Sequence, residues 1–253
     1  MKRVLVVLMA LMLLASADMW AQRRHRPPVR RHHTMSADGI GLDFSYVHSW
    51  YRTTDWASDE RVVSEGLDGF RIGLNKDFTL VPHALYFQTG LDYTYLNDAK
   101  DKSVASLKII GDRTEHALSI PLRLKYLVPV SDKIKVGVDA GPSLVCGLSS
   151  KLKYRTRLNE NSTAFYIYDY HSGKAKVESM PPAVQEWADA QQPGTSLRRL
   201  YVQMGAAVAA EFLDVLEAKV GCDFGLVNNY KGQLSDAYKM RQGQFYLAVG
   251  LRF

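Results

Sequence analysis

The chain is poor in cysteine and lacks a second long apolar run. Of its 253 residues only Cys146 and Cys222 are cysteines, and no cluster of metal-ligating side chains surrounds either, so we favour two isolated apolar residues over a disulfide, a metal site or a nucleophile. Beyond the N-terminal segment no stretch approaches the ~18 apolar residues of a transmembrane helix. The mean hydropathy of −0.18 still fits a membrane β-barrel, because alternating strands average to near-neutral values.

The chain also lacks a convergent catalytic set. The His–Ser pairs near predicted strand ends are His48 with Ser49 and His116 with Ser119. Within a strand, neighbours and residues three apart point to opposite faces, so neither pair shares a face. We therefore predict no catalytic residues, no cofactor, no metal site and no enzyme activity. An enzyme acting on lipid or peptide at the outer rim is the alternative.

The N-terminal segment has the pattern of a secretory signal peptide, expected over residues 1–21. Lys2 and Arg3 precede the apolar run 4–14, and small residues follow, with cleavage after Ala17 or after Ala21. Export would place the protein outside the cytoplasm, so we predict no nucleic-acid partner.

Residues 22–37 are rich in Arg, His and Pro and poor in apolar residues, a composition that does not form a core. We interpret them as a basic disordered periplasmic tether. Two alternatives are an arm that binds an acidic partner and a metal site using His25, His32 and His33, for which carboxylate partners are missing.

The last nine residues alternate strictly and end on an aromatic residue, which is typical of the closing strand of a bacterial outer-membrane β-barrel. Barrel-assembly machinery is the partner expected for this strand. Its apolar face consists of Phe245, Leu247, Val249, Leu251 and Phe253.

Seven further segments alternate in the same way. Together with the C-terminal segment they predict an all-β, eight-stranded antiparallel up-and-down transmembrane barrel over residues 38–253. Three short connections, 76–82, 129–132 and 212–214, alternate with four long ones, 49–65, 97–114, 149–198 and 228–239, as expected for tight periplasmic turns and long extracellular loops. The predicted strands cover 40–46, 70–75, 85–95, 118–126, 134–141, 200–211, 216–224 and 245–253.

The second face of these strands is too polar for a dry core or for lipid, so we predict that it lines a plugged, charge-balanced lumen while the apolar face meets lipid. An eight-stranded barrel is only just wide enough for its own side chains, which excludes an open channel. Glu211 belongs to the same face. The predicted lumen charges are Asp43, Arg71, Asp92, Arg123, Lys125, Lys135, Asp139, Glu217, Lys219, Asp223 and Arg252.

The long connection 149–198 combines basic residues with tyrosines, with residues 164–171 able to pair back as a hairpin and a short helix expected at 182–190. An ordered extracellular flap is one interpretation, and a binding surface for a protein or for a glycan such as a polyanionic sugar or lipopolysaccharide is the other. The candidate surface comprises Lys151, Lys153, Tyr154, Arg155, Arg157, Tyr166, Tyr168 and Tyr170.

Several segments together resemble the PorT-like outer-membrane β-barrel family. They are 85–90, 116–126 with its Ile-Pro-Leu step, 137–142, 217–226 and the C-terminal Gly-Leu-Arg-Phe. The resemblance implies an eight-stranded barrel in the outer membrane of a Gram-negative bacterium, without a catalytic set, and allows an accessory role in secretion.

Overall fold

The computed structural model describes residues 39–253 except 56–60, 64–65, 83, 105–106, 160–161, 179–195 and 232–233. The predicted signal peptide, the basic tether and the helix expected at 182–190 lie outside the described residues.

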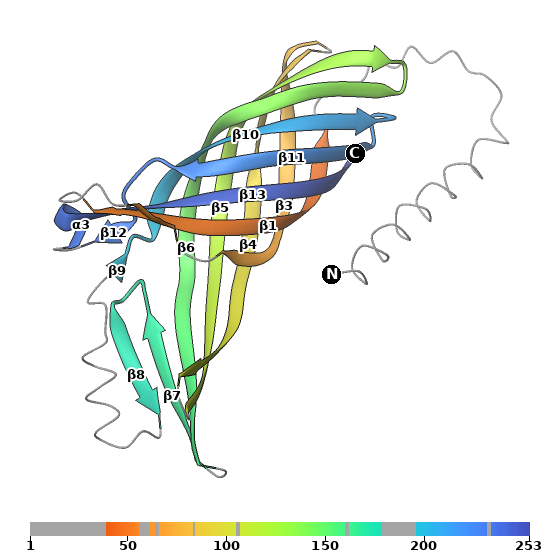
Figure 1. The fold of residues 1–253 in the computed structure, drawn as a ribbon. Coiled ribbons are helices and arrows are strands. Elements are labelled where there is room, and N and C mark those ends of the chain that lie inside the picture. The colour runs from red at the N-terminus through yellow and green to blue at the C-terminus, as the bar shows by residue number, and fades with distance from the viewer. Residues whose placement is uncertain are drawn as a thin grey trace. The chain divides into compact units, whose positions relative to one another are not determined.

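Eight antiparallel strands form a closed ring (Figure 1). Each pairs with its neighbour along the chain, β6 pairs with β10, and the ring closes where β13 pairs with β1. The predicted up-and-down barrel is therefore confirmed, and all eight predicted segments lie in ring strands. These are β1 (Ile40–Asp55), β3 (Leu67–Val81), β4 (Leu85–Val104), β5 (Leu107–Ser131), β6 (Ile134–Asn159), β10 (Leu200–Phe212), β11 (Leu216–Gly225) and β13 (Tyr238–Arg252).

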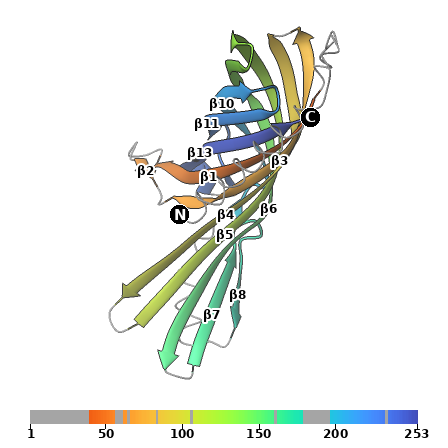
Figure 2. The ribbon, with the colours of Figure 1, turned by 90° about the vertical axis from the view of Figure 1, so that its right-hand side faces the viewer.

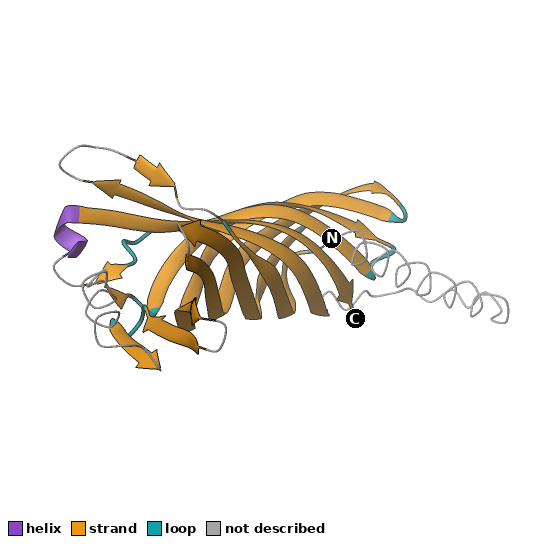
Figure 3. Ribbon diagram, turned by 60° about the horizontal axis from the view of Figure 1, so that its bottom comes forward, coloured by secondary structure: helices purple, strands orange, loops and turns teal. Residues whose placement is uncertain are grey.

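Smaller elements join the ring at the end opposite the described termini. A hairpin continues β6 and extends one sheet beyond the ring (Figure 2), while a separate two-stranded sheet and one helical turn lie near the other strands at this end (Figure 3). Among the described residues, no helix has the length and apolar character needed to cross a bilayer. The elements are β2 (Arg61–Val63), β7 (Ser162–Asp169), β8 (Lys174–Glu178), β9 (Ser196–Leu197), β12 (Tyr230–Lys231) and α3 (Leu234–Ala237).

The side chains of the ring strands alternate between an exposed apolar face and a buried polar face. On β5, Leu124 exposes 53 % of its surface, whereas the neighbouring Lys125 exposes 0 %. The same alternation puts Phe44 outside and Ser45 inside on β1. Apolar groups exposed around a charged interior are the reverse of a water-soluble barrel, and they are the face pattern of a transmembrane barrel.

Several connections expected as loops are strands instead. The predicted turn 76–82 is mostly the end of β3, and the predicted loop 97–114 is mostly the paired ends of β4 and β5. The expected hairpin at 164–171 is present as β7, paired with β6. Inter-strand hydrogen bonds do not require an apolar face, so the ladders continue where the apolar alternation stops.

Candidate functional sites: the closed lumen and the extended sheet

The inward faces of the ring strands bring the predicted lumen charges into one ion-pair network. At the end near the described termini, the fully buried Lys125 of β5 contacts three acids from other strands: Glu217 of β11 at 2.6 Å, Asp77 of β3 at 3.3 Å, and Glu211 of β10. Glu217 also contacts Arg252 of β13. A buried cation is stable here because several carboxylates surround it.

A second cluster lies further along the same lumen. Arg123 contacts Asp223 at 2.5 Å and Asp139 at 3.2 Å, and Arg71 contacts the other oxygen of Asp223 at 3.0 Å. The backbone makes room for these groups at Gly205, where an added Cβ would collide with both Asp223 and Arg123. Glycine at this position therefore allows the narrow ring to hold an arginine–aspartate pair.

The remaining predicted lumen residues also face inward. Lys219 contacts Asp139 at 3.5 Å, and Asp43 contacts Arg252 at 3.4 Å. Asp92 is buried on the same face, whereas Lys135 pairs with the half-exposed Asp214 at the ring's end. Asp77 also faces the lumen but is absent from the predicted lumen charges, because residues 76–82 are predicted to form a turn.

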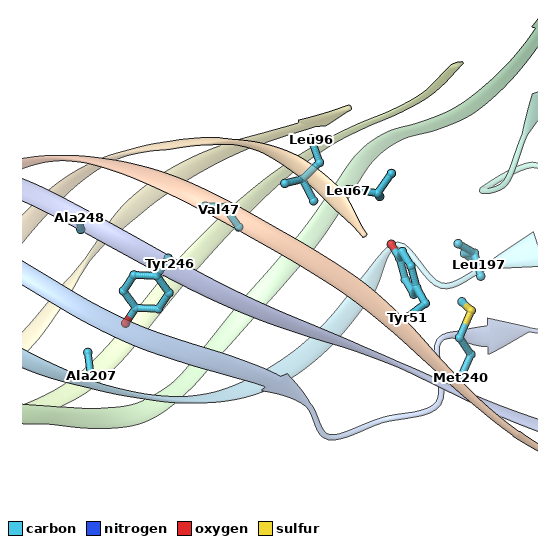
Figure 4. Close-up of a cluster of buried hydrophobic side chains, with 9 residues drawn as sticks. All are labelled: Val47, Tyr51, Leu67, Leu96, Leu197, Ala207, Met240, Tyr246 and Ala248. Carbon is cyan, nitrogen blue, oxygen red and sulfur yellow. The ribbon is translucent and has the colours of Figure 1, made fainter. Parts of the chain in front are cut away.

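The lumen is packed rather than open. The space among Arg71, Asp92, Arg123 and Lys219 has water-sized room of about 40 Å³, enough for a few water molecules at ~10–15 Å³ each. Towards the end opposite the described termini, side chains of β1, β3, β4, β9 and β13 form an apolar cluster (Figure 4). Its residues in this region include Val47, Tyr51, Leu67, Leu96, Leu197 and Met240.

Above this cluster, Tyr51 of β1 and Glu115 of β5 meet across the mouth of the ring. The Tyr51 hydroxyl donates to both carboxylate oxygens of Glu115, at 2.8 and 2.7 Å. Ser150 donates to the same carboxylate at 3.1 Å, and Arg113 donates at 2.6 Å. The Arg113 guanidinium also lies over the rings of Tyr51 and Tyr170. This cluster could not be predicted from the sequence, because Tyr51 and Ser150 lie far from Glu115 in the chain.

The electrostatics of this cluster favour a neutral tyrosine beside an ion pair. Burial, and then the Glu115 charge, raise the pKa of Tyr51 well above its ordinary value. Burial disfavours the charged form of Arg113, but the Glu115 carboxylate outweighs it and the pKa of Arg113 is raised. The Glu115 carboxyl group at the mouth therefore receives hydrogen bonds from a charged donor, Arg113, and from a neutral donor, Tyr51.

The sheet that extends beyond the ring consists of the outer parts of β5 and β6 with β7 and β8, and we call it the extended sheet. A bulge in β6 decides which of its residues face outward. His116 of β5 pairs with Ser149, and Ala117 pairs with Gly147, so Leu148 is an extra residue. One inserted residue exchanges the two faces of a strand. Ser150 therefore points inward and is buried, whereas Lys151 is exposed on the continuation of the outer wall.

The outward face of this sheet is basic. Lys151 and Lys153 of β6 lie on one side of β7, and Lys174 and Lys176 of β8 lie opposite them in register with the same β7 residues. All four lysines are exposed. Strands spaced at ~4.8 Å place the two rows ~10 Å apart.

The tyrosines of the predicted binding surface lie on the opposite face. Tyr166 and Tyr168 are buried, exposing 6 % and 1 %, and pack with Leu152 and Tyr170. Of Tyr154, Arg155 and Arg157 only the backbone pairing is described. The structure therefore divides the candidate surface into an exposed lysine face and a packed tyrosine face. Strand parity would have revealed this division once the register of β6 and β7 was known.

The two histidines considered for catalysis lie on the outer wall. His48 contacts Asp68 through Nδ1 at 2.8 Å, and Asp68 accepts from the Tyr46 hydroxyl, whereas Ser49 is buried inside. His116 contacts the Tyr93 hydroxyl at 2.7 Å, and Ser119 is also inside. In neither pair do base and nucleophile share a face, as strand parity predicted. Among the described residues no group of three or more His, Cys, Asp or Glu side chains could hold a metal ion. Cys146 and Cys222 are not joined in a disulfide.

Neither a protein-family model nor a curated protein matches the sequence. Solved structures similar to the chain include the attachment invasion locus protein Ail of Yersinia pestis in complex with the heparin analogue sucrose octasulfate, with 11 % identity over 85 % of this chain and 99 % of that one, at a TM-score of 0.39. Neisserial surface protein A is 11 % identical over 84 % of this chain and 97 % of its own, with a TM-score of 0.37. The outer-membrane enzyme PagL is 13 % identical over 81 % of this chain and 97 % of its own, with a TM-score of 0.39.

Likeness at this level carries no argument about function, and these proteins include both an enzyme and proteins not described as such. The description of the fold rests on the strand pairing itself. The resemblance to the PorT-like family is not shown by these comparisons and stays a prediction.

Proposed function

We propose that the chain is an integral outer-membrane protein of a Gram-negative bacterium, with a plugged lumen and no enzymatic activity, that recognises an acidic partner through the extended sheet, which we place on the extracellular side. The membrane location is supported by the apolar outer wall and by the signal-like N-terminus. A C-terminal strand ending in Phe253 suits recognition by barrel-assembly machinery. A secretion accessory role would use the same surface to hold a partner.

The observation that carries the recognition proposal is the outward lysine face. Lys151, Lys153, Lys174 and Lys176 form two rows with one aspartate, Asp169, between them. Asp169 accepts hydrogen bonds from the backbone of His171 and Ser172, so part of its charge is already compensated. Asp112 of β5 is in register with Lys153 on the same face, so the four lysines are set against two aspartates. The face still presents net positive charge, which favours a polyanionic glycan or an acidic protein segment.

The proposal is tested with a sulfated polysaccharide as the probe. We expect purified protein to bind dextran sulfate and not neutral dextran, with binding that weakens as salt rises. The variant K151Q/K153Q should lose roughly tenfold or more in affinity, at about 1 kcal/mol for each base removed.

The matched control is K76Q/K133Q, which removes two exposed lysines at the opposite end of the barrel. It should bind as the unmodified protein does. Equal losses in both variants would contradict a site on the extended sheet.

An enzyme at the outer rim is the second candidate because of the contact between His48 and Asp68. This pair could orient a general base, with Nε2 left to accept a proton. Ser49 is buried on the other face of β1, and among the described hydroxyl groups no hydrogen bond to His48 supplies a nucleophile. We therefore retain the non-enzymatic function.

A further inference from the structure

Two arginines face each other on the outer wall where β1 and β13 leave the apolar band. Arg52 and Arg241 are directly opposite in register, and both are exposed. Directly opposed residues on antiparallel strands have Cβ atoms ~4.5–5.5 Å apart, and like charges in this position destabilise the pair. Within the described residues no carboxylate forms an ion pair with either guanidinium. The pair is therefore set up to receive an anion from outside the chain.

The rows below the arginines show at which depth the pair lies. Moving along β1 and β13 from the end near the described termini, the outer wall carries Leu42 with Leu251, Phe44 with Val249, and Tyr46 with Leu247. His48 with Phe245 and Trp50 with Gly243 come next, and Arg52 with Arg241 follow directly.

Aromatic side chains of β1 and β11 mark the level just below the pair on this part of the wall. The Trp50 ring packs where a Cβ of Gly243 would be. It meets the Phe224 ring of β11 edge-on, with 6.3 Å between the ring centroids. Aromatic side chains of this kind mark the boundary between hydrocarbon and headgroups. The arginine pair, one row further out, therefore lies at the level of the outer-leaflet headgroups.

We propose that Arg52 and Arg241 bind a phosphate on the headgroup of an outer-leaflet glycolipid, whose acyl chains lie along the apolar rows beneath. Two guanidinium forks on one anion give charge-assisted hydrogen bonds and remove the repulsion between them. We assign the phosphate to a lipid and not to free phosphate, because a continuous apolar and aromatic wall lies directly below the arginine pair. This inference rests on the proposed membrane location but not on the lysine face, which belongs to other strands.

The test uses the full chain in phosphatidylcholine vesicles that contain either bisphosphorylated lipid A or dephosphorylated lipid A. Lipid retained by the protein after extraction is counted by native mass spectrometry. We expect retention of the phosphorylated lipid and about a 25-fold loss of it in R52Q/R241Q, at ~1 kcal/mol for each base near the membrane surface. Equal retention of both lipids would overturn the proposal.

Three further arms locate the site and its ligand. The K76Q/K133Q control should retain lipid A as the unmodified chain does, and an equal loss in it would show a bulk charge effect and overturn the site. Inorganic phosphate should not displace the lipid, and full displacement would overturn the lipid source. If R52Q/R241Q fails to fold, as judged by heat-modifiable migration on gels, the single variants R52Q and R241Q replace it and should each lose about fivefold. Failure of the unmodified chain to insert into vesicles would contradict the proposed function, whereas insertion without lipid preference contradicts this inference alone.

Discussion

The lumen and the extended sheet use the same kinds of charged residue in opposite ways. Inside the ring, Lys125 exposes none of its surface and contacts three carboxylates. On the sheet, Lys151 and Lys153 are exposed, and their paired neighbours are Asp169 and Ile167 on β7 and Thr114 and Asp112 on β5. A charge that is surrounded by countercharges stabilises the fold, whereas a charge left in solvent contributes little to stability and remains available to a partner. The charges of the lumen therefore have a structural role, and the exposed lysines of the sheet have the role that we propose in recognition.

The largest expected effect comes from removing a carboxylate at the centre of the lumen. Glu217 is fully buried and contacts Lys125, Lys219 and Arg252, so E217Q leaves three buried cations short of one countercharge. We expect the free energy of unfolding in vesicles to fall by about 3–5 kcal/mol, measured by urea titration. The control D214N removes the carboxylate of the more exposed ion pair with Lys135 at the end of the ring. It should lower the free energy of unfolding by about 0–1 kcal/mol. An E217Q loss as small as that of D214N would remove the distinction between lumen and surface.

A smaller loss is expected at the mouth, where lumen and sheet meet. Y51F removes both hydrogen bonds from the hydroxyl to Glu115 but leaves those from Arg113 and Ser150. We expect a loss of about 2 kcal/mol in the free energy of unfolding at neutral pH, as for a hydrogen bond to a charged group. The control Y238F removes an exposed hydroxyl at the outer end of β13 and should change stability by less than about 0.5 kcal/mol.

The same variant has a defined pH dependence. The pKa of Tyr51 is raised on folding above the ~10 of an unfolded tyrosine, so its contribution is complete below pH ~10 and declines as the pH rises above that value. The difference in stability between the unmodified chain and Y51F should therefore narrow in alkaline solution. A difference that widens there would contradict the assignment of a neutral Tyr51 beside Glu115.

How much of this could be predicted from the sequence depends on how local each signal is. The ring strands were predictable because lipid imposes a period of two on each strand, as in Phe245 to Phe253. The same period put Arg123 and Lys125 inside before any contact was known. The continuation of β4, β5 and β6 beyond the apolar band was not predictable, because polar residues paired in water carry no periodic apolar signal.

The sites outside the band depended on register, which alternation within one strand does not contain. The extra residue Leu148 reverses the faces of β6, so Lys151 and Lys153 point outward, while strand alternation places the tyrosines on the opposite face. The Tyr51–Glu115 contact joins strands three steps apart in the ring, and the opposition of Arg52 and Arg241 joins the first strand to the last. Each of these needs the closed topology before two residues can be recognised as neighbours.

The smallest expected effect is also the sharpest check on the comparison. K151Q/K153Q removes two positive charges, and E217Q removes one negative charge, so formal charge alone would assign the larger change to the lysine variant. Because both lysines are exposed on the outward face, we expect the free energy of unfolding to stay within about 0.5 kcal/mol of the unmodified chain. Urea titration in the same vesicles measures this, alongside polysaccharide binding on the same preparation. A destabilisation of several kcal/mol would mean that the lysine face is packed against something that the barrel needs in order to fold, and the sheet would then share the structural role of the lumen.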